Sequence, residues 1–256
     1  HPCPVMRFVR ARRARMLEEG GGVRSDHPHG WVDPWVYRDD ESDPENVVRN
    51  GARLFSSPAD RRHPDLARFA IARSDQIDLD VALHADGHVS ALDEDQVRRY
   101  ALLMDEIVAP LSARGLATNS IACEVLSTLP YPVGRVMRRH DLGRFRVTQK
   151  ILLDDPRDVY RVENSQPEDW IMLGTHDTPP IWELAARWVG AEPGTKWADY
   201  LESLRQRFGM PRCEALRPGE NRGDLIHALM ATMLASPARH VAIFFADLFG
   251  MTARYN

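Results

Sequence analysis

Short apolar runs alternate along this chain with longer amphipathic stretches, and this alternation is the feature that most limits how the chain can fold. The pattern is typical of β/α units around a parallel sheet. The runs that indicate strands are residues 22–25, 120–124, 145–148, 170–173 and 240–245. Helical periodicity covers residues 5–18, 94–112, 133–139, 180–189, 196–208 and 225–235. We therefore predict the α/β class.

Two stretches interrupt the alternation. Residues 39–93 are rich in Asp, Arg, Pro and Ser and have weak periodicity, which predicts a long insertion between the first and second strands. A few helical turns are expected near residues 64–71 of that insertion. Residues 154–169, with Pro156 and Pro167, predict a second irregular loop.

Charge and cysteine usage exclude several classes of protein. The 33 basic and 37 acidic residues give a net charge of −4, which offers no general attraction for nucleic acid or an anionic membrane. Every apolar run is shorter than the roughly 18 residues that a membrane span needs. The cysteines, at positions 3, 123 and 213, are odd in number and lack CxxC spacing, so neither a disulfide framework nor a zinc site is expected. With no secretory signal at the N-terminus, we predict a cytoplasmic protein.

Acidic residues follow several of the predicted strands. The first strand runs into Asp26, the second ends in Glu124, the fourth leads into Asp177, and the fifth is expected to end at Asp247. The carboxyl ends of parallel strands open on one face, where β/α enzymes build their sites. We therefore expect these acids to converge there.

The tract around Asp26 is dense in ionisable and aromatic groups. Arg24 and Asp26 are two apart on a predicted strand and so share a face, where a guanidinium would keep the carboxylate ionised, as a nucleophile requires. Nearby aromatic residues, Trp31, Trp35 and Tyr37, offer flat faces for sugar rings. The alternative is a structural Arg–Asp pair beside aromatic residues that fill the core.

The other two acids also have two interpretations. Apolar residues flank Glu124, which would raise its pKa and suit it to general acid catalysis, although a capping or salt-bridged Glu explains it as well. His176 and Asp177 offer hydrogen-bonding groups for a polyhydroxylated ligand, although such a pair often caps a helix. Taken together, the three acids predict glycosyl transfer: in retaining mechanisms a nucleophilic carboxylate and an acid lie about 5 to 5.5 Å apart.

Four motifs occur in one order along the chain. They are R-x-D-H-x-x-G from Arg24, E-x-L-x-x-x-P from Glu124, G-T-H-D from Gly174, and Asp247 followed by Gly250 and Arg254-x-Asn256. Asp26 and Glu124 are 98 positions apart, and Glu124 and Asp177 are 53 apart. This order resembles the amylomaltases, the 4-α-glucanotransferases of glycoside hydrolase family 77, which are related to the α-amylase clan.

The resemblance implies a fold. That family has a (β/α)8 TIM barrel, and five predicted strands cover only part of it. Residues 1–256 are thus expected to form the C-terminal portion of a catalytic TIM barrel, with the insertion at about 39–93. A first residue that is His and an abrupt stop at Asn256 also predict a piece of a longer chain.

The resemblance also implies an activity and the residues for it. The family's nucleophile falls on Asp26, its general acid/base on Glu124 and its transition-state-stabilising aspartate on Asp177. Arg24 and His176 match positions that contact the sugar at the cleavage site, and His27, inside the first motif, is assigned to substrate binding with them. The implied enzyme moves α-1,4-glucan segments between malto-oligosaccharides, amylose or glycogen-derived glucans through a covalent glycosyl-Asp ester, with no metal and no organic cofactor.

Two other functions stay open from the residues alone. A metal-dependent hydrolase on a similar barrel would use His27 and His29 with Asp26, Glu124 and His176 as ligands. A catalytically incompetent part of a barrel is the other alternative, because the chain starts and stops abruptly.

Overall fold

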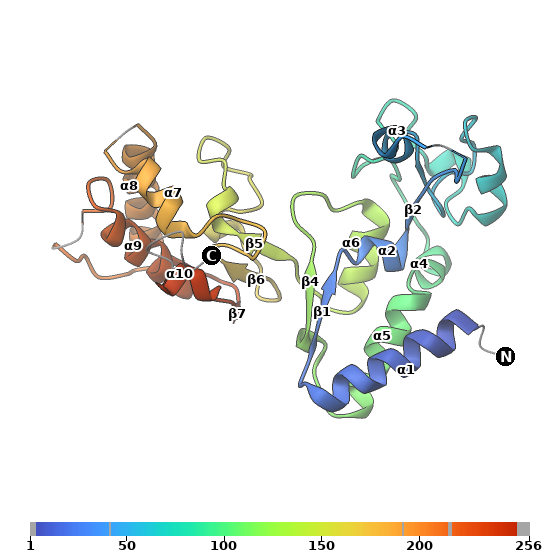
Figure 1. Cartoon of the computed structure of the whole chain (residues 1–256), viewed down its shortest axis with the longest axis horizontal. Helices are drawn as coiled ribbons and strands as arrows, with labels where there is room; N and C mark the ends of the chain where they lie inside the picture. The colour runs from blue at the N-terminus through green and yellow to red at the C-terminus, as the bar shows by residue number, and fades with distance from the viewer. Residues whose placement is uncertain (1–3, 41, 191, 215–216, 250–256) are drawn as a thin grey trace. The chain divides into compact units, whose positions relative to one another are not determined.

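The structure is a computed structural model that describes residues 4–40, 42–190, 192–214 and 217–249 (Figure 1). The chain divides into two compact units, His1–Leu142 and Gly143–Asn256, which are described in turn. Among the described helices, none is both long and apolar enough to cross a bilayer.

A pair of parallel strands forms the centre of the first unit. Strand β1 (Val23–Asp26) pairs with β4 (Ile121–Glu124) so that Val23 faces Ile121 and Asp26 faces Glu124. The helices of this unit are α1 (Pro4–Glu19), α2 (His29–Val32), α3 (Pro44–Arg49), α4 (Glu94–Tyr100), α5 (Leu102–Ala113) and α6 (Tyr131–Arg139), with a 3-10 turn η3 (Thr118–Ser120) before β4.

The two faces of this strand pair have different neighbours because side chains alternate along a strand. Ile121 and Cys123 are buried in an apolar cluster with residues of the helices, among them Met104 of α5 and Val136 of α6. The other face carries Arg24, Asp26, Ala122 and Glu124. Hydrophobic burial therefore fixes the strands against the helices and turns the polar side chains away from them.

The insertion has more structure than its composition indicates. Strand β2 (Trp35–Val36) pairs antiparallel with β3 (Ala52–Arg53), and 3-10 turns follow at η1 (Pro64–Phe69), in agreement with the turns expected near 64–71, and at η2 (Ser74–Gln76). Buried Asp33 holds this segment in place, because its carboxylate accepts hydrogen bonds from the Phe55 N–H, at 2.9 Å, and from the Ser56 hydroxyl. The Ser56 hydroxyl also lies 2.8 Å from the Tyr100 hydroxyl of α4.

The second unit is built on three parallel strands. Strand β6 (Trp170–Met172) lies between β5 (Phe145–Val147) and β7 (His240–Val241). Helices α7 (Ile181–Trp188), α8 (Glu192–Arg207), α9 (Arg222–Leu234) and α10 (Phe245–Phe249) complete it, with 3-10 turns η4 (Thr148–Lys150) and η5 (Val162–Asn164). Its apolar core joins Ile171 and Leu173 to residues of α7, α8 and α9.

All five predicted strands are present, and the α/β class is confirmed. Two boundaries were wrong. The helix expected over 94–112 is interrupted at Ala101, although the Ala101 N–H still donates to the Val97 carbonyl. The strand expected over 240–245 ends at Val241, because pairing with β6 stops there, and Phe245 begins α10. In the described residues the strands form separate two- and three-stranded sheets and not a closed barrel.

Candidate active site

Asp26 and Glu124 end neighbouring strands, and they face each other in the parallel register. Residues paired in this way project to the same side of a sheet. Atoms of the two carboxyl groups and Nδ1 of His27 all lie within 4.8 Å of one another. This spacing is close to that of a retaining glycosidase and well below the roughly 6.5 to 9.5 Å of an inverting one.

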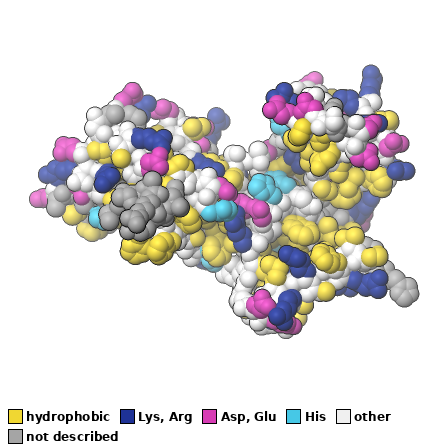
Figure 2. Space-filling view, in the orientation of Figure 1, with side chains coloured by type: hydrophobic (Ala, Val, Ile, Leu, Met, Phe, Trp, Pro, Cys, Tyr) yellow, Lys and Arg dark blue, Asp and Glu magenta, His cyan; other side chains and the backbone are white. Residues whose placement is uncertain are grey.

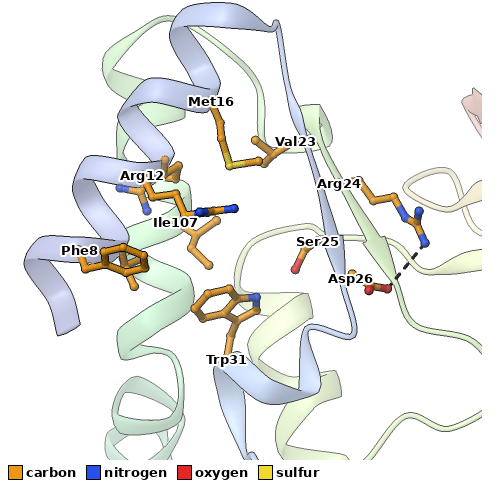
Figure 3. A pocket seen from close by; sticks show the side chains of 11 residues that line it. Phe8, Arg12, Met16, Val23, Arg24, Ser25, Asp26, Trp31 and Ile107 are labelled. Atoms are coloured by element: carbon orange, nitrogen blue, oxygen red, sulfur yellow. Dashed lines mark ion pairs between the residues drawn. The ribbon is translucent and has the colours of Figure 1, made fainter.

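Arg24 completes the charge pattern of this face. Its Nη2 atom lies 2.8 Å from Oε2 of Glu124 and 3.7 Å from Oδ1 of Asp26, the second of which is drawn in Figure 3. The spacing of two residues on β1 places Arg24 and Asp26 on one face, as the sequence predicts. One guanidinium therefore bridges both carboxyl groups.

The two carboxyl groups have different environments. The side chain of Asp26 is 72% exposed, whereas that of Glu124 is 3% exposed. Burial raises the pKa of Glu124, a hydrogen bond with Asp26 raises it further, and Arg24 opposes both. The pKa of Asp26 is lowered, first by its hydrogen bond with Glu124 and then by His27, with a smaller contribution from Arg24. The pair therefore releases the proton of Asp26 more readily than that of Glu124.

The pKa shifts of Glu124 and Asp26 can be compared with those expected from the sequence. The raised pKa of Glu124 agrees with the prediction from its apolar neighbours, since burial is the largest cause. The lowered pKa of Asp26 also agrees, but the main cause differs: the Glu124 carboxyl contributes more than the Arg24 guanidinium. Opposite shifts in two adjacent carboxyl groups are typical of a base or nucleophile paired with an acid.

His27 follows Asp26 in a strained conformation. Its φ of 44° lies in the left-handed region, which a residue with a Cβ rarely adopts. This turn takes the chain from β1 toward α2 and places Nδ1 3.1 Å from Oδ1 of Asp26 and 3.8 Å from Oε2 of Glu124. Strained backbone is concentrated at functional sites, where the surrounding structure maintains it.

The same three residues have the atom types of a divalent-metal site. Asp26, His27 and Glu124 form the one such group of three found in the described part of the chain. However, the Arg24 guanidinium already contacts both carboxyl groups, and its positive charge would repel a metal cation at the same oxygens. His29, which the metal-hydrolase alternative also needs, directs Nε2 to the Thr128 carbonyl at 3.3 Å. The geometry favours an ion-paired carboxyl pair over a metal centre.

His176 and Asp177 lie in the second unit, in the loop between β6 and α7. The loop makes a tight turn, in which the Thr178 hydroxyl donates to the Thr175 carbonyl at 2.9 Å and accepts the Thr175 N–H at 2.8 Å. Both side chains are exposed, and Nε2 of His176 lies 3.3 Å from Oδ1 of Asp177. The turn therefore presents an imidazole and a carboxylate together, available to a ligand.

The structure thus brings the predicted residues together in two groups. Arg24, Asp26, His27 and Glu124 form one group in the first unit, and His176 and Asp177 form the other in the second. The meeting of the two groups around one sugar stays a prediction.

Other sequence-based expectations need correction. Asp247 was expected as a strand-end acid of the site, but it lies within α10 and is buried, with hydrogen bonds to backbone N–H groups. Trp31 packs against the core, which is the structural alternative considered for the aromatic residues. Gly250, Arg254 and Asn256 of the last motif lie outside the described residues.

Sequence comparison decides the family. A family model described as 4-alpha-glucanotransferase, glycoside hydrolase family 77, matches residues 7–256. The chain belongs to the 4-alpha-glucanotransferase family. Its match covers both strand-end acids of the first unit and the His176–Asp177 turn of the second. No curated protein matches this family member in sequence.

Solved structures agree with the family assignment. The chain is similar to an amylomaltase from Streptococcus agalactiae in complex with acarbose, with a TM-score of 0.58 and 13% identity over 96% of this chain. It is also similar to the amylomaltase from Corynebacterium glutamicum, with a TM-score of 0.53 and 14% identity over 92% of this chain. It spans 36% and 30% of the lengths of those two proteins. This 4-alpha-glucanotransferase family member therefore has an amylomaltase-like fold over its length.

Proposed function

We propose that the complete protein is a retaining 4-α-glucanotransferase in which Asp26 is the nucleophile and Glu124 the general acid/base. The observation that carries the proposal is the Asp26–Glu124 pair: an oxygen of each carboxyl group lies within 4.8 Å of one of the other, on neighbouring strands, and the two pKa values move in opposite directions. Family membership supplies the reaction class.

The pair supports transfer in two steps. The Asp26 carboxylate attacks the anomeric carbon of an α-1,4-linked donor while the bond to the leaving oxygen breaks, and Glu124 gives that oxygen its proton. A glucan is then held on Asp26 as a β-linked ester. In the second step the 4-hydroxyl of an acceptor glucan attacks the same carbon, Glu124 takes the hydroxyl proton, and the Asp26 carboxylate leaves.

The proposal extends to the second unit. We assign Asp177 the stabilisation of the oxocarbenium-like transition state, and Arg24, His27 and His176 the binding of the sugar at the cleavage site. The substrates proposed are malto-oligosaccharides, amylose or glycogen-derived glucans, and no metal or organic cofactor takes part. Acarbose in the Streptococcus agalactiae amylomaltase supports this class of ligand. The cytoplasmic location stays a prediction from the sequence.

We also propose that residues 1–256 are the C-terminal portion of a catalytic TIM barrel. A groove of about 260 Å³ beside β1 supports this (Figure 3). Phe8 and Met16 of α1 line it opposite Trp31, and hydrophobic side chains interrupted by arginines lie over α1 in Figure 2. Within the described residues β1 pairs with β4 alone, so its other edge is open.

Polar atoms beside the groove support the same proposal. Nε of Arg13 and Oγ of Ser25 are buried without a hydrogen-bond partner in the described part of the chain, and both residues line the groove. Buried polar atoms normally have partners. A further strand paired along β1 would bring backbone acceptors to this edge and cover the exposed apolar side chains.

Incubation of the full-length protein with maltotriose, followed by sizing of the products, tests the proposed activity. Transfer yields glucose together with maltopentaose and longer products, whereas hydrolysis yields only glucose and maltose. Asp26→Asn should abolish transfer, while Asp39→Asn, an exposed aspartate of the same unit, should leave it unchanged. Full activity in the presence of a chelator is expected, and loss of activity with the chelator would favour the metal-dependent alternative.

A further inference from the structure

The loop that carries His176 and Asp177 is anchored by few groups of its own. Pro179 and Pro180 have no backbone N–H, and Pro180, at the N-cap position of α7, provides no side-chain cap. The first N–H groups of a helix need acceptors from elsewhere. The chain between β6 and α7 therefore depends on other elements for its position.

Asp247 of α10 provides an acceptor at each end of this loop. Its Oδ2 accepts the Gly174 N–H at 3.1 Å, and its Oδ1 accepts the Ile181 N–H at 3.1 Å. One carboxylate thus connects the two ends of the loop, and it caps α7 from a position 66 residues away in the sequence. The Asp247 side chain is 1% exposed. Hydrogen bonds of a buried carboxylate to backbone N–H groups are among the stronger ones in proteins.

A second bond links α10 to α7. The indole N–H of Trp182 donates to the backbone carbonyl of Asp247 at 2.8 Å. The Asp247 N–H in turn donates to the Phe244 carbonyl at 2.9 Å, which fixes the start of α10. Asp247 is therefore held by its own backbone as well as by its side chain.

The packing around Gly174 is tight. A Cβ added at Gly174 would lie 2.9 Å from Oγ1 of Thr178, 3.0 Å from Nε2 of Gln149 and 3.3 Å from Oδ2 of Asp247. The contacts between Thr178 and Thr175 fix the turn between the two anchored ends. The exposed Asp177 side chain consequently extends from a backbone that is held on both sides.

We propose that Asp247 is a positioning residue for the transfer reaction, which sets the place of Asp177 by joining both ends of the 174–181 loop. The assignment rests on the proposed function of Asp177. We assign Asp247 itself no contact with the substrate. Because a displacement of about 1 Å in an active site lowers rates by roughly 100-fold, loosening of this loop should be visible in kcat.

The test compares two near-isosteric variants of the full-length protein. Asp247→Asn leaves one acceptor oxygen for two N–H groups, and kcat for maltotriose disproportionation should fall roughly 10- to 100-fold with a smaller change in KM. Asp169→Asn is the control: Asp169 is also buried and accepts the Arg144 N–H at 2.9 Å and the Gln166 N–H at 2.8 Å. It also pairs with the Arg146 guanidinium at 2.8 Å, but it holds no proposed site residue. This control should lower the melting temperature while kcat, measured well below it, is retained.

A double-mutant cycle separates positioning from a general loss of structure. If Asp247 acts through Asp177, adding Asp247→Asn to Asp177→Asn should lower kcat little further. Independent, multiplied losses would overturn the assignment, as would a wild-type kcat in Asp247→Asn or an equal kcat loss in Asp169→Asn. If Asp247→Asn does not fold, Trp182→Phe replaces it as the test, because it removes the hydrogen bond to the Asp247 carbonyl. Trp182→Phe should also lower kcat, and an unchanged kcat in this variant would contradict the proposal.

Hydrogen exchange tests the loop without any activity. The amides of Gly174 and Ile181 should exchange faster in Asp247→Asn than in the wild type and in Asp169→Asn, and equal protection would overturn the positioning role. If the wild-type protein does not disproportionate maltotriose, the proposed function fails while this exchange result still reports on the loop.

Discussion

Replacement of Glu124 by Gln separates its proposed role as an acid from its role in folding. Gln has nearly the volume of Glu and resembles the neutral form that burial favours, so it should occupy the same buried position beside Asp26. Gln cannot give up a proton to the leaving oxygen. General acid catalysis contributes typically 10²- to 10⁴-fold, which is about 3 to 5 kcal/mol of activation free energy.

The size of the loss should depend on the donor. With maltotriose the leaving group is a sugar hydroxyl that needs a proton, and transfer by Glu124→Gln should fall by that factor of about 10² to 10⁴. With a maltosyl fluoride donor, fluoride departs without needing a proton. The rate of the first step in Glu124→Gln should therefore stay within about tenfold of the wild-type rate. Asp26→Asn should lose activity with both donors, because the attacking carboxylate is absent.

The assay follows glucose release from maltotriose and the initial burst of fluoride from the fluoride donor. The full-length protein and both variants are compared, and thermal unfolding confirms that each is folded. Equal losses by Glu124→Gln on the two donors, or full activity on maltotriose, would refute the assignment of Glu124 as the acid.

Three further predictions concern charge and packing. Arg24→Met removes the cation that lowers the pKa values of Glu124 and Asp26, so both limbs of the pH–activity profile should move to higher pH; an unmoved profile contradicts the bridging role. Burial raises the pKa of Asp33 from 3.8 to about 6, so the folded state binds this proton more tightly than the unfolded state does. The free energy of unfolding should therefore be about 3 kcal/mol higher below pH 4, and this contribution should be lost as the pH rises through 6. Denaturant unfolding at several pH values should show this slope in the wild type and not in Asp33→Asn. Met104→Ala, in the core of the first unit, should lower the free energy of unfolding by about 2 to 5 kcal/mol, whereas Leu102→Ala, exposed on the same helix, should change it by less than about 0.5; equal losses would contradict the packing described.

The strands and the acid pair could be predicted because local sequence determines them. Apolar runs bounded by turn residues gave β1, β4, β5 and β6 to within one residue at each end. The parallel arrangement then placed Asp26 and Glu124 at strand ends, and their register brought them together. Spacing of two along β1 was enough to add Arg24 to the same face.

The roles of Asp33 and Asp247 could not be predicted because both depend on contacts between distant segments. Asp33 binds Phe55 and Ser56, and Asp247 binds Gly174 and Ile181. Neither sequence neighbourhood contains a cap or turn pattern that indicates such partners. The apolar run before Asp247 favours a strand, and only the end of its pairing with β6 shows that α10 begins there. The Pro179–Pro180 pair was the one local indication that a distant residue caps α7, because it leaves the start of that helix without a side-chain cap of its own.

Asp26 is proposed to carry the glucan between donor and acceptor. Mass spectrometry of peptides from the full-length protein, trapped with a fluorinated glucosyl fluoride, identifies the carboxyl group that bears the ester. A single added sugar is expected on the peptide that contains Asp26, and none is expected in Asp26→Asn. An ester on Glu124, on Asp177 or on no residue of an active enzyme would contradict it.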